Sequence, residues 1–129
     1  MKPYWFVINN KIFIVNEKDN PMKIDLSNIP IEVMDTPTKK ELGMMGREEL
    51  NGAMVFPFDE IGERSFWMKN CKIPLDIIFV IDGEIQDIHH NAPPCEEDCE
   101  RYQGIADTII EFNGGYSKKN GLEIGDKIE

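Results

Sequence analysis

The chain has 129 residues, 41% of them hydrophobic and 29% charged, which is typical of one soluble globular domain. Its formal net charge is −10 at pH 7, and residues 48–129 hold 18 of its 24 acidic residues. Such a surface repels phosphate groups, so we expect no nucleic-acid partner and no binding to anionic membranes. The apolar runs are far shorter than the roughly 20 residues that span a bilayer, which predicts no membrane span.

The N-terminal stretch YWFVINNKIFIV predicts a β-hairpin. Apolar residues flank Asn9 and Asn10, and asparagine tolerates the positive φ angles of a two-residue type I′ turn. We expect residues 1–30 to form an N-terminal hairpin extension and residues 31–129 to form a β-rich domain, the whole being one compact unit.

The start of the chain lacks the small-residue cleavage site of a signal peptide. Without an export signal, three cysteines favour a reducing compartment and do not require disulfides. We therefore expect a cytoplasmic protein.

The residues after the first hairpin predict a connector and then a helix. The connector is polar and contains two prolines, with one short edge strand expected around Met22–Ile24. A brief strand follows Pro30. Thr36 as N-cap and Pro37 at the first helical position then predict a helix to about Met45, limited by nearby glycines.

The remaining sequence predicts mostly strands. The stretches AMVFPF and RSFWMKN read as two strands joined by the acidic turn DEIGE, ADTIIEF and EIGDKIE read as later strands, and GGYSKKNG reads as a turn or a single helical turn. The regular spacing favours an α+β, mainly β fold, with an antiparallel curled sheet or small barrel and one short helix.

A second hairpin is predicted around Asp82 and Gly83, which give a strong signal for a two-residue turn. Regular pairing from this turn places Asp76 opposite His89, where the two side chains could touch. The pair suggests an acid/base couple, or alternatively a cross-strand ion pair on a half-exposed face. A β-bulge would shift the register by one residue and separate the pair.

The stretches GMMGREELNGAMVFPF, SFWMKNCKIPLDIIFVIDGEI, APPC and GLEIGDKI, in this order, resemble the domain-of-unknown-function 192 family. The resemblance extends from about Ile31 to Ile128. The sequence departs from the family pattern at Met44, Ala53 and Cys71. The resemblance implies a compact β-rich domain with a short helix, and it implies no established activity.

The candidate ligand-binding residues lie on these motifs and are Arg47, Trp67, Lys69, Asn70 and Asp76. Alternation along SFWMKN places Trp67 and Lys69 on one face, where an indole and an ammonium could bind a small anion or a sugar-like ligand. The alternative is that Trp67 packs over the helix while Arg47 and Asp76 form a buried ion pair. Asn70, the last candidate, also suits a turn.

Four potential metal ligands occur within eleven residues, namely His89, His90, Cys95 and Cys99. Alternation sends the two histidines to opposite faces, and the cysteine spacing is not the common zinc spacing, so we expect no metal and no other cofactor. A disulfide between Cys95 and Cys99 and a pair of free thiols are both compatible with the sequence. Cys71 is expected to be unpaired.

The sequence therefore predicts a binding or accessory module with a cleft near Trp67, which takes a small molecule or a peptide. One alternative is a hydrolase or transferase that uses Asp76 and His89. Another is an acidic module that binds basic proteins. The oligomeric state stays open.

Overall fold

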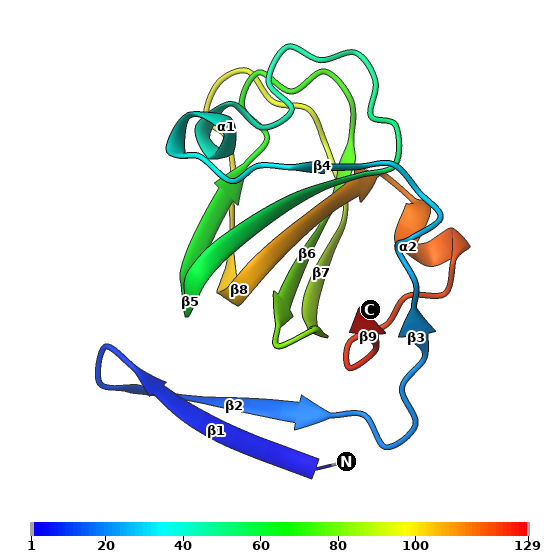
Figure 1. Ribbon diagram of the computed structural model, residues 1–129. Helices are drawn as coiled ribbons and strands as arrows, with labels where there is room; N and C mark the ends of the chain where they lie inside the picture. Colours follow the sequence, from blue (N-terminus) through cyan, green and yellow to red (C-terminus); the bar gives the residue numbers. More distant parts are fainter. Residues whose placement is uncertain (1, 129) are drawn as a thin grey trace.

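A computed structural model describes the backbone of residues 2–128 and, except at residues 2–4, 6 and 14–17, their side chains. Within this range the protein is mostly strand, with a two-stranded sheet and a seven-stranded sheet ordered β3-β9-β7-β6-β8-β5-β4. The large sheet curls into a half-barrel, and the two-stranded ribbon lies below it in Figure 1. The predicted α+β, mainly β fold is confirmed.

The first hairpin forms as the asparagines predict. Strands β1 (Lys2–Ile8) and β2 (Lys11–Glu17) pair in antiparallel fashion, with Ile8 opposite Lys11. Asn9 and Asn10 have φ angles of 50° and 62°, the left-handed conformation that this turn requires.

Two short helices lie within the described residues. In α1 (Pro37–Leu42), the Thr36 hydroxyl accepts a hydrogen bond from the Lys39 N–H, so the predicted N-cap is confirmed. The helix ends at Leu42 with Gly43 as its C-cap, earlier than the predicted Met45. Helix α2 (Tyr116–Lys119) is the single helical turn that was one of two expectations for its segment. No helix in residues 2–128 has the length and hydrophobicity to cross a bilayer.

The two edges of the large sheet are parallel pairs. Strand β3 (Lys23–Ile24) pairs with β9 (Lys127–Ile128), and β4 (Ile31–Val33) pairs with the start of β5 (Ala53–Trp67). The inner pairs are antiparallel. The predicted edge strand near Met22–Ile24 is thus present, as β3.

Strand β5 corrects one prediction from the sequence. Its 15 residues run without a turn against β8 (Arg101–Asn113), so the acidic stretch at residues 59–63 bends the strand and does not reverse it. The register shifts between Pro57 and Gly62. There the Arg64 guanidinium lies 3.9 Å from the centroid of the Phe58 ring.

The second hairpin has the predicted turn but not the predicted register. Strands β6 (Leu75–Ile81) and β7 (Glu84–Ala92) meet at Asp82 and Gly83, whose φ angles are 47° and 77°. An irregularity between Phe79 and Val80 shifts the pairing by one residue, so that His89 is opposite Ile77, and a second irregularity follows between Leu75 and Ile77. The predicted pairing of Asp76 with His89 is therefore wrong.

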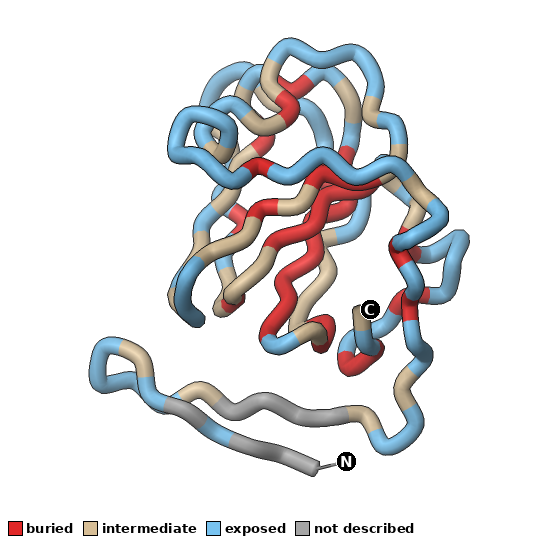
Figure 2. Tube along the Cα trace, viewed as in Figure 1, coloured by how far each residue is buried: buried red, intermediate tan, exposed pale blue. Residues whose placement is uncertain are grey.

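Strand β6 is buried along its whole length, because both faces of the sheet are covered (Figure 2). Leu75, Ile77 and Phe79 pack in one apolar cluster, with methionines and aromatic residues from β5 and the α1 segment. Ile78 and Val80 pack in the other, with Ile110, Phe112 and Leu122 among its members. The prediction of one half-exposed face on this strand is wrong.

Candidate functional site

A cleft of about 270 Å³ lies between the α1 segment and strands β5 and β8. Apolar side chains form much of its wall, and they come from the turn after α1 and from both ends of β5. Its lining residues are Lys40, Glu41, Leu42, Gly43, Met44, Met45, Phe56, Ser65, Phe66, Trp67, Cys71, Arg101 and Glu111.

Trp67 lies at the mouth of the cleft with its side chain partly exposed. The Arg101 guanidinium carbon is 3.8 Å from the indole ring centroid, and the Lys69 Nζ is 5.3 Å from it. The expectation that Trp67 and Lys69 project together agrees with this arrangement. Arg101, which sequence reasoning missed, is opposite Trp67 in the pairing of β8 with β5. Two cations at one indole make an attractive environment for an anionic or π-rich group.

Glu111 lies at the inner end of the cleft and is only 4% exposed. Burial raises the pKa of its carboxyl to about 8, because a charged carboxylate is poorly solvated there. The signal of Glu111 in the sequence was a charged residue inside the apolar run ADTIIEF.

Cys71, also at the inner end, is unpaired as predicted and buried. Burial raises the pKa of its thiol to about 11, with a contribution from the nearby Glu111 charge. A thiol with so high a pKa contains little thiolate at neutral pH, so it has little nucleophilic character.

Arg47, Lys69 and Asn70 lie outside the lining of this cleft, although Lys69 is close to the Trp67 ring. The Arg47 Nη1 is 2.7 Å from Glu32 Oε1, and the pair is exposed, so the alternative of a buried Arg47–Asp76 pair is wrong. Asn70 has a φ of 59° and its backbone bonds to Gly46 and Cys95, which is the turn-forming role that the sequence left open.

Asp76 is fully buried and accepts hydrogen bonds from three backbone N–H groups. Its Oδ1 accepts from Asn91 at 2.8 Å and Gly115 at 3.1 Å, and its Oδ2 accepts from Ser117 at 2.8 Å. Burial alone would raise the pKa of this carboxyl, but the three N–H bonds outweigh burial and lower it. Asp76 therefore joins β6, β7 and the start of α2, outside the cleft.

His89 is separated from Asp76 and lies between aromatic rings. Its imidazole centroid is 5.3 Å from those of Phe79 and Tyr102, and its Nε2 is 3.3 Å from Asp87 Oδ2. Neither His89 nor Asp76 lines the cleft at Trp67. The hypothesis of an Asp76–His89 acid/base couple is therefore wrong.

The four residues considered as metal ligands are not gathered. Cys95 and Cys99 form a disulfide, which decides between the two states that the sequence allowed, and His90 is exposed. Among the side chains described, no group of three or more His, Cys, Asp or Glu residues is arranged to hold a metal ion.

A comparison with protein families identifies the family of this chain. A family model named DUF192, described as an uncharacterized ACR, matches residues 19–129. The chain belongs to the DUF192 family. The matched region contains Trp67, Arg101 and Glu111, so the cleft lies wholly within the part that defines the family. The match begins at residue 19, earlier than the resemblance to the quoted motifs.

Two solved structures resemble this DUF192 protein over nearly all of its length. One, from Sinorhizobium meliloti 1021, is described as that of a candidate transcription regulator. It is 27% identical with a TM-score of 0.70, and the match covers 95% of this chain and 87% of the other. The second is a protein of unknown function from Novosphingobium aromaticivorans DSM 12444, 29% identical with a TM-score of 0.69, covering 97% and 81%. No curated protein matches the chain.

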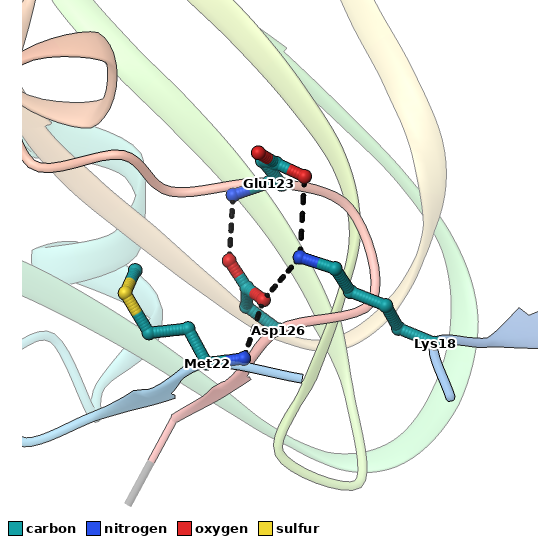
Figure 3. Close-up of polar contacts among 4 residues, drawn as sticks. All are labelled: Lys18, Met22, Glu123 and Asp126. Atoms are coloured by element: carbon teal, nitrogen blue, oxygen red, sulfur yellow. Dashed lines mark hydrogen bonds and ion pairs between the residues drawn. The ribbon is translucent and has the colours of Figure 1, made fainter. Parts of the chain in front are cut away.

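A second buried carboxylate in this DUF192 chain, Asp126, holds the connector after the first hairpin (Figure 3). Its Oδ1 accepts from Lys18 Nζ at 2.9 Å and from the Met22 N–H at 2.8 Å, and its Oδ2 accepts from the Glu123 N–H at 2.9 Å. Burial would raise the pKa of Asp126, but these hydrogen bonds and the Lys18 charge lower it. Both oxygens of the Asp126 carboxylate accept hydrogen bonds from protein donors, so Asp126 connects these segments of the structure.

Proposed function

We propose that this protein is a binding module for a small molecule or a peptide end, and that the ligand occupies the cleft beside Trp67. The observation that carries the proposal is the combination of a partly exposed indole, the Arg101 guanidinium beside it and an apolar interior in one concave site, with Lys69 at the same indole just outside the lining. Ligand sites in proteins are concave and mostly apolar, with a few polar groups that orient the ligand.

The two parts of the cleft suit different parts of one ligand. Met44, Phe56 and Phe66 supply apolar surface in the interior, where removal of ligand carbon from water is favourable by roughly 25 cal/mol per Å². Arg101 and Lys69, at the Trp67 ring, would pair with a negative or polar group of the ligand that stays near solvent. A peptide carboxyl terminus or a small organic acid has this division.

Trp67 allows the proposal to be tested directly, because the only other tryptophan is Trp5 in the N-terminal hairpin. Trp5 is 68% exposed and far along the chain from the cleft residues, so its indole N–H signal is an internal control. We expect a panel of small fragments with an apolar body and a polar end to shift the Trp67 indole signal in ¹H–¹⁵N NMR spectra. Trp67→Ala should abolish the binding, and Trp5→Ala should leave it unchanged.

If no fragment of such a panel moves the Trp67 signal more than that of Trp5, the cleft is not a ligand site. Fragments that bind equally well to Trp67→Ala would contradict the proposal in the same way.

We also propose that nucleic acid is not the partner. The relative from Sinorhizobium meliloti is described as a candidate transcription regulator, but DNA affinity depends on lysine and arginine contacts to phosphate. The net charge of −10 in this chain opposes such contacts.

A further inference from the structure

We propose that Glu111 is the polar anchor of the cleft, and that the cleft takes ligands with an uncharged amide-like head, in which a hydrogen-bond donor lies beside a carbonyl acceptor. This inference rests on the proposed function and specifies the ligand for the same site.

The first argument is the position of the Glu111 carboxyl. Strand β8 places Glu111 opposite the fully buried Met54, and the side chain reaches the cleft with 4% of the residue exposed. Burial is the cause of its raised pKa, and its oxygens are not among the fully buried side-chain atoms that lack a hydrogen-bond partner. A ligand head that fills the cleft would therefore bring a hydrogen-bonding group to this carboxyl.

The second argument is the protonation state. With a pKa of about 8, the carboxyl is mostly protonated at neutral pH, so it presents one O–H donor and one C=O acceptor side by side. An amide offers the complementary pair, and the two groups can form two hydrogen bonds at once. A ligand with a neutral head also avoids the cost of burying a charge beside the apolar wall.

The third argument is the sign of the other charges that line the cleft. Lys40 and Arg101 come from α1 and β8, and Glu41 is the only other charged lining residue of the described chain. Cys71, which faces Glu111 from the segment before β6, keeps its proton because its pKa is about 11. A cationic ligand would meet two cations and would need an ionised Glu111 in a poorly solvated place. The surroundings therefore disfavour a cationic head at Glu111, and a negative group of the same ligand would lie at Trp67, beside Arg101 and Lys69.

The test uses two probes with the same six-carbon body, hexanamide and hexylamine, titrated into the full chain and followed by ¹H–¹⁵N NMR. We expect hexanamide to bind more tightly at pH 7 and to shift the signals of Glu111, Cys71 and the Trp67 indole, while the Trp5 indole stays in place. Between pH 7 and pH 9 its apparent Kd should rise about tenfold, because the protonated fraction of Glu111 falls by that factor.

Two variants separate the anchor from the rest of the cleft. Glu111→Gln keeps a donor and an acceptor but cannot ionise, so we expect it to bind hexanamide with no change between pH 7 and pH 9. Glu111→Ala should bind about tenfold more weakly at pH 7, the loss expected for removal of hydrogen bonds to a neutral group. The pH series on the unmutated protein tests the anchor even where a variant fails to fold.

The possible failures are distinguishable. Hexylamine that binds more tightly than hexanamide, and more tightly still at pH 9, would overturn the neutral-head ligand in favour of a cation. Hexanamide that shifts Trp67 with an affinity independent of pH would overturn Glu111 as anchor and leave the proposed function standing. The absence of any shift at Trp67 with either probe would count against both.

Discussion

The Asp76 carboxylate accepts a 2.8 Å hydrogen bond from the backbone N–H of Ser117, which lies 41 residues further along the chain. With the bonds from Asn91 and Gly115, this contact joins three segments through one buried side chain. Asp76 therefore has a structural role at the meeting point of these segments.

We expect Asp76→Asn to lower the free energy of unfolding by about 2–3 kcal/mol, because a neutral amide accepts more weakly and turns N–H donors toward backbone N–H groups. Urea denaturation measures the change. The matched control is Asp25→Asn, since Asp25 accepts a comparable backbone bond from Ser27 at an exposed turn. If both variants lost the same free energy of unfolding, the burial of Asp76 would not explain the strength of its hydrogen bonds.

The pH dependence of stability should follow from the same residue. The pKa of Asp76 is lowered in the folded protein, so its stabilising effect is complete above the unfolded-state pKa of about 3.9 and is lost as the pH falls through the lower folded value. Thermal unfolding between pH 5 and pH 2 should show a smaller loss of stability for Asp76→Asn than for the unmutated protein. If stability fell equally with pH in Asp76→Asn and in the unmutated protein, this prediction would be contradicted.

Substitution of Asp126 should lower the free energy of unfolding more than substitution of Lys18, although the two residues form one ion pair. Asp126→Asn disturbs all three hydrogen bonds of a fully buried carboxylate, so we expect a loss of about 2 kcal/mol. Lys18→Met removes a partly exposed partner and leaves two N–H bonds to Asp126, so we expect a smaller loss of unfolding free energy than for Asp126→Asn. Urea denaturation of both variants checks the order, and a larger loss for Lys18→Met would reverse our interpretation.

The Cys95–Cys99 disulfide closes a short loop, so its effect on stability should be modest. The entropy of so small a loop corresponds to about 2 kcal/mol, which a Cys95→Ser/Cys99→Ser double variant should lose. Alkylation in denaturant without reductant, followed by mass spectrometry, should label Cys71 alone. Three labelled cysteines in freshly purified protein would show that the bridge does not form under those conditions.

The acidic surface predicts that the protein does not shift a DNA duplex in an electrophoretic mobility assay at about 50 mM salt. A basic protein run in parallel shows that the assay detects binding. Retardation that weakens as salt is added would mean that phosphate contacts exist in spite of the net charge.

Local signals in the sequence predicted the turns and caps well. Asp82 and Gly83, the two asparagines of the first hairpin, and Thr36 all lie where their side chains or φ angles suggest. These features depend on residues that are adjacent in the chain, so a short stretch of sequence is enough to predict them.

The register of the second hairpin could not be predicted in the same way. Gln86 is an extra residue between the pairs Phe79–Asp87 and Val80–Ile85, and no turn residue marks that position. Asn91, near the second irregularity, has a φ of 53° and bonds to Asp76, a contact that only the folded chain creates. A shift of one residue was enough to remove the proposed catalytic pair.

The sequence pointed to Trp67, which lines the cleft, but not to most of the other residues around it. Trp67 and Lys69 came from alternation along one strand, whereas Arg101 and Glu111 come from β8, far along the chain. Pairing between β5 and β8 brings them together, and the sequence gives no direct sign of which strands are neighbours.

The bend in β5 has a mechanical consequence for the cleft. Phe56 and Phe66 lie on opposite sides of the bend, yet their rings meet edge to face with centroids 4.9 Å apart. One continuous strand thus supplies two walls of the same cleft, because it bends between Phe56 and Phe66. The width of the cleft then depends on the curvature of one strand, so a substitution near Pro57 or Gly62, neither of which lines the cleft, would widen or narrow it.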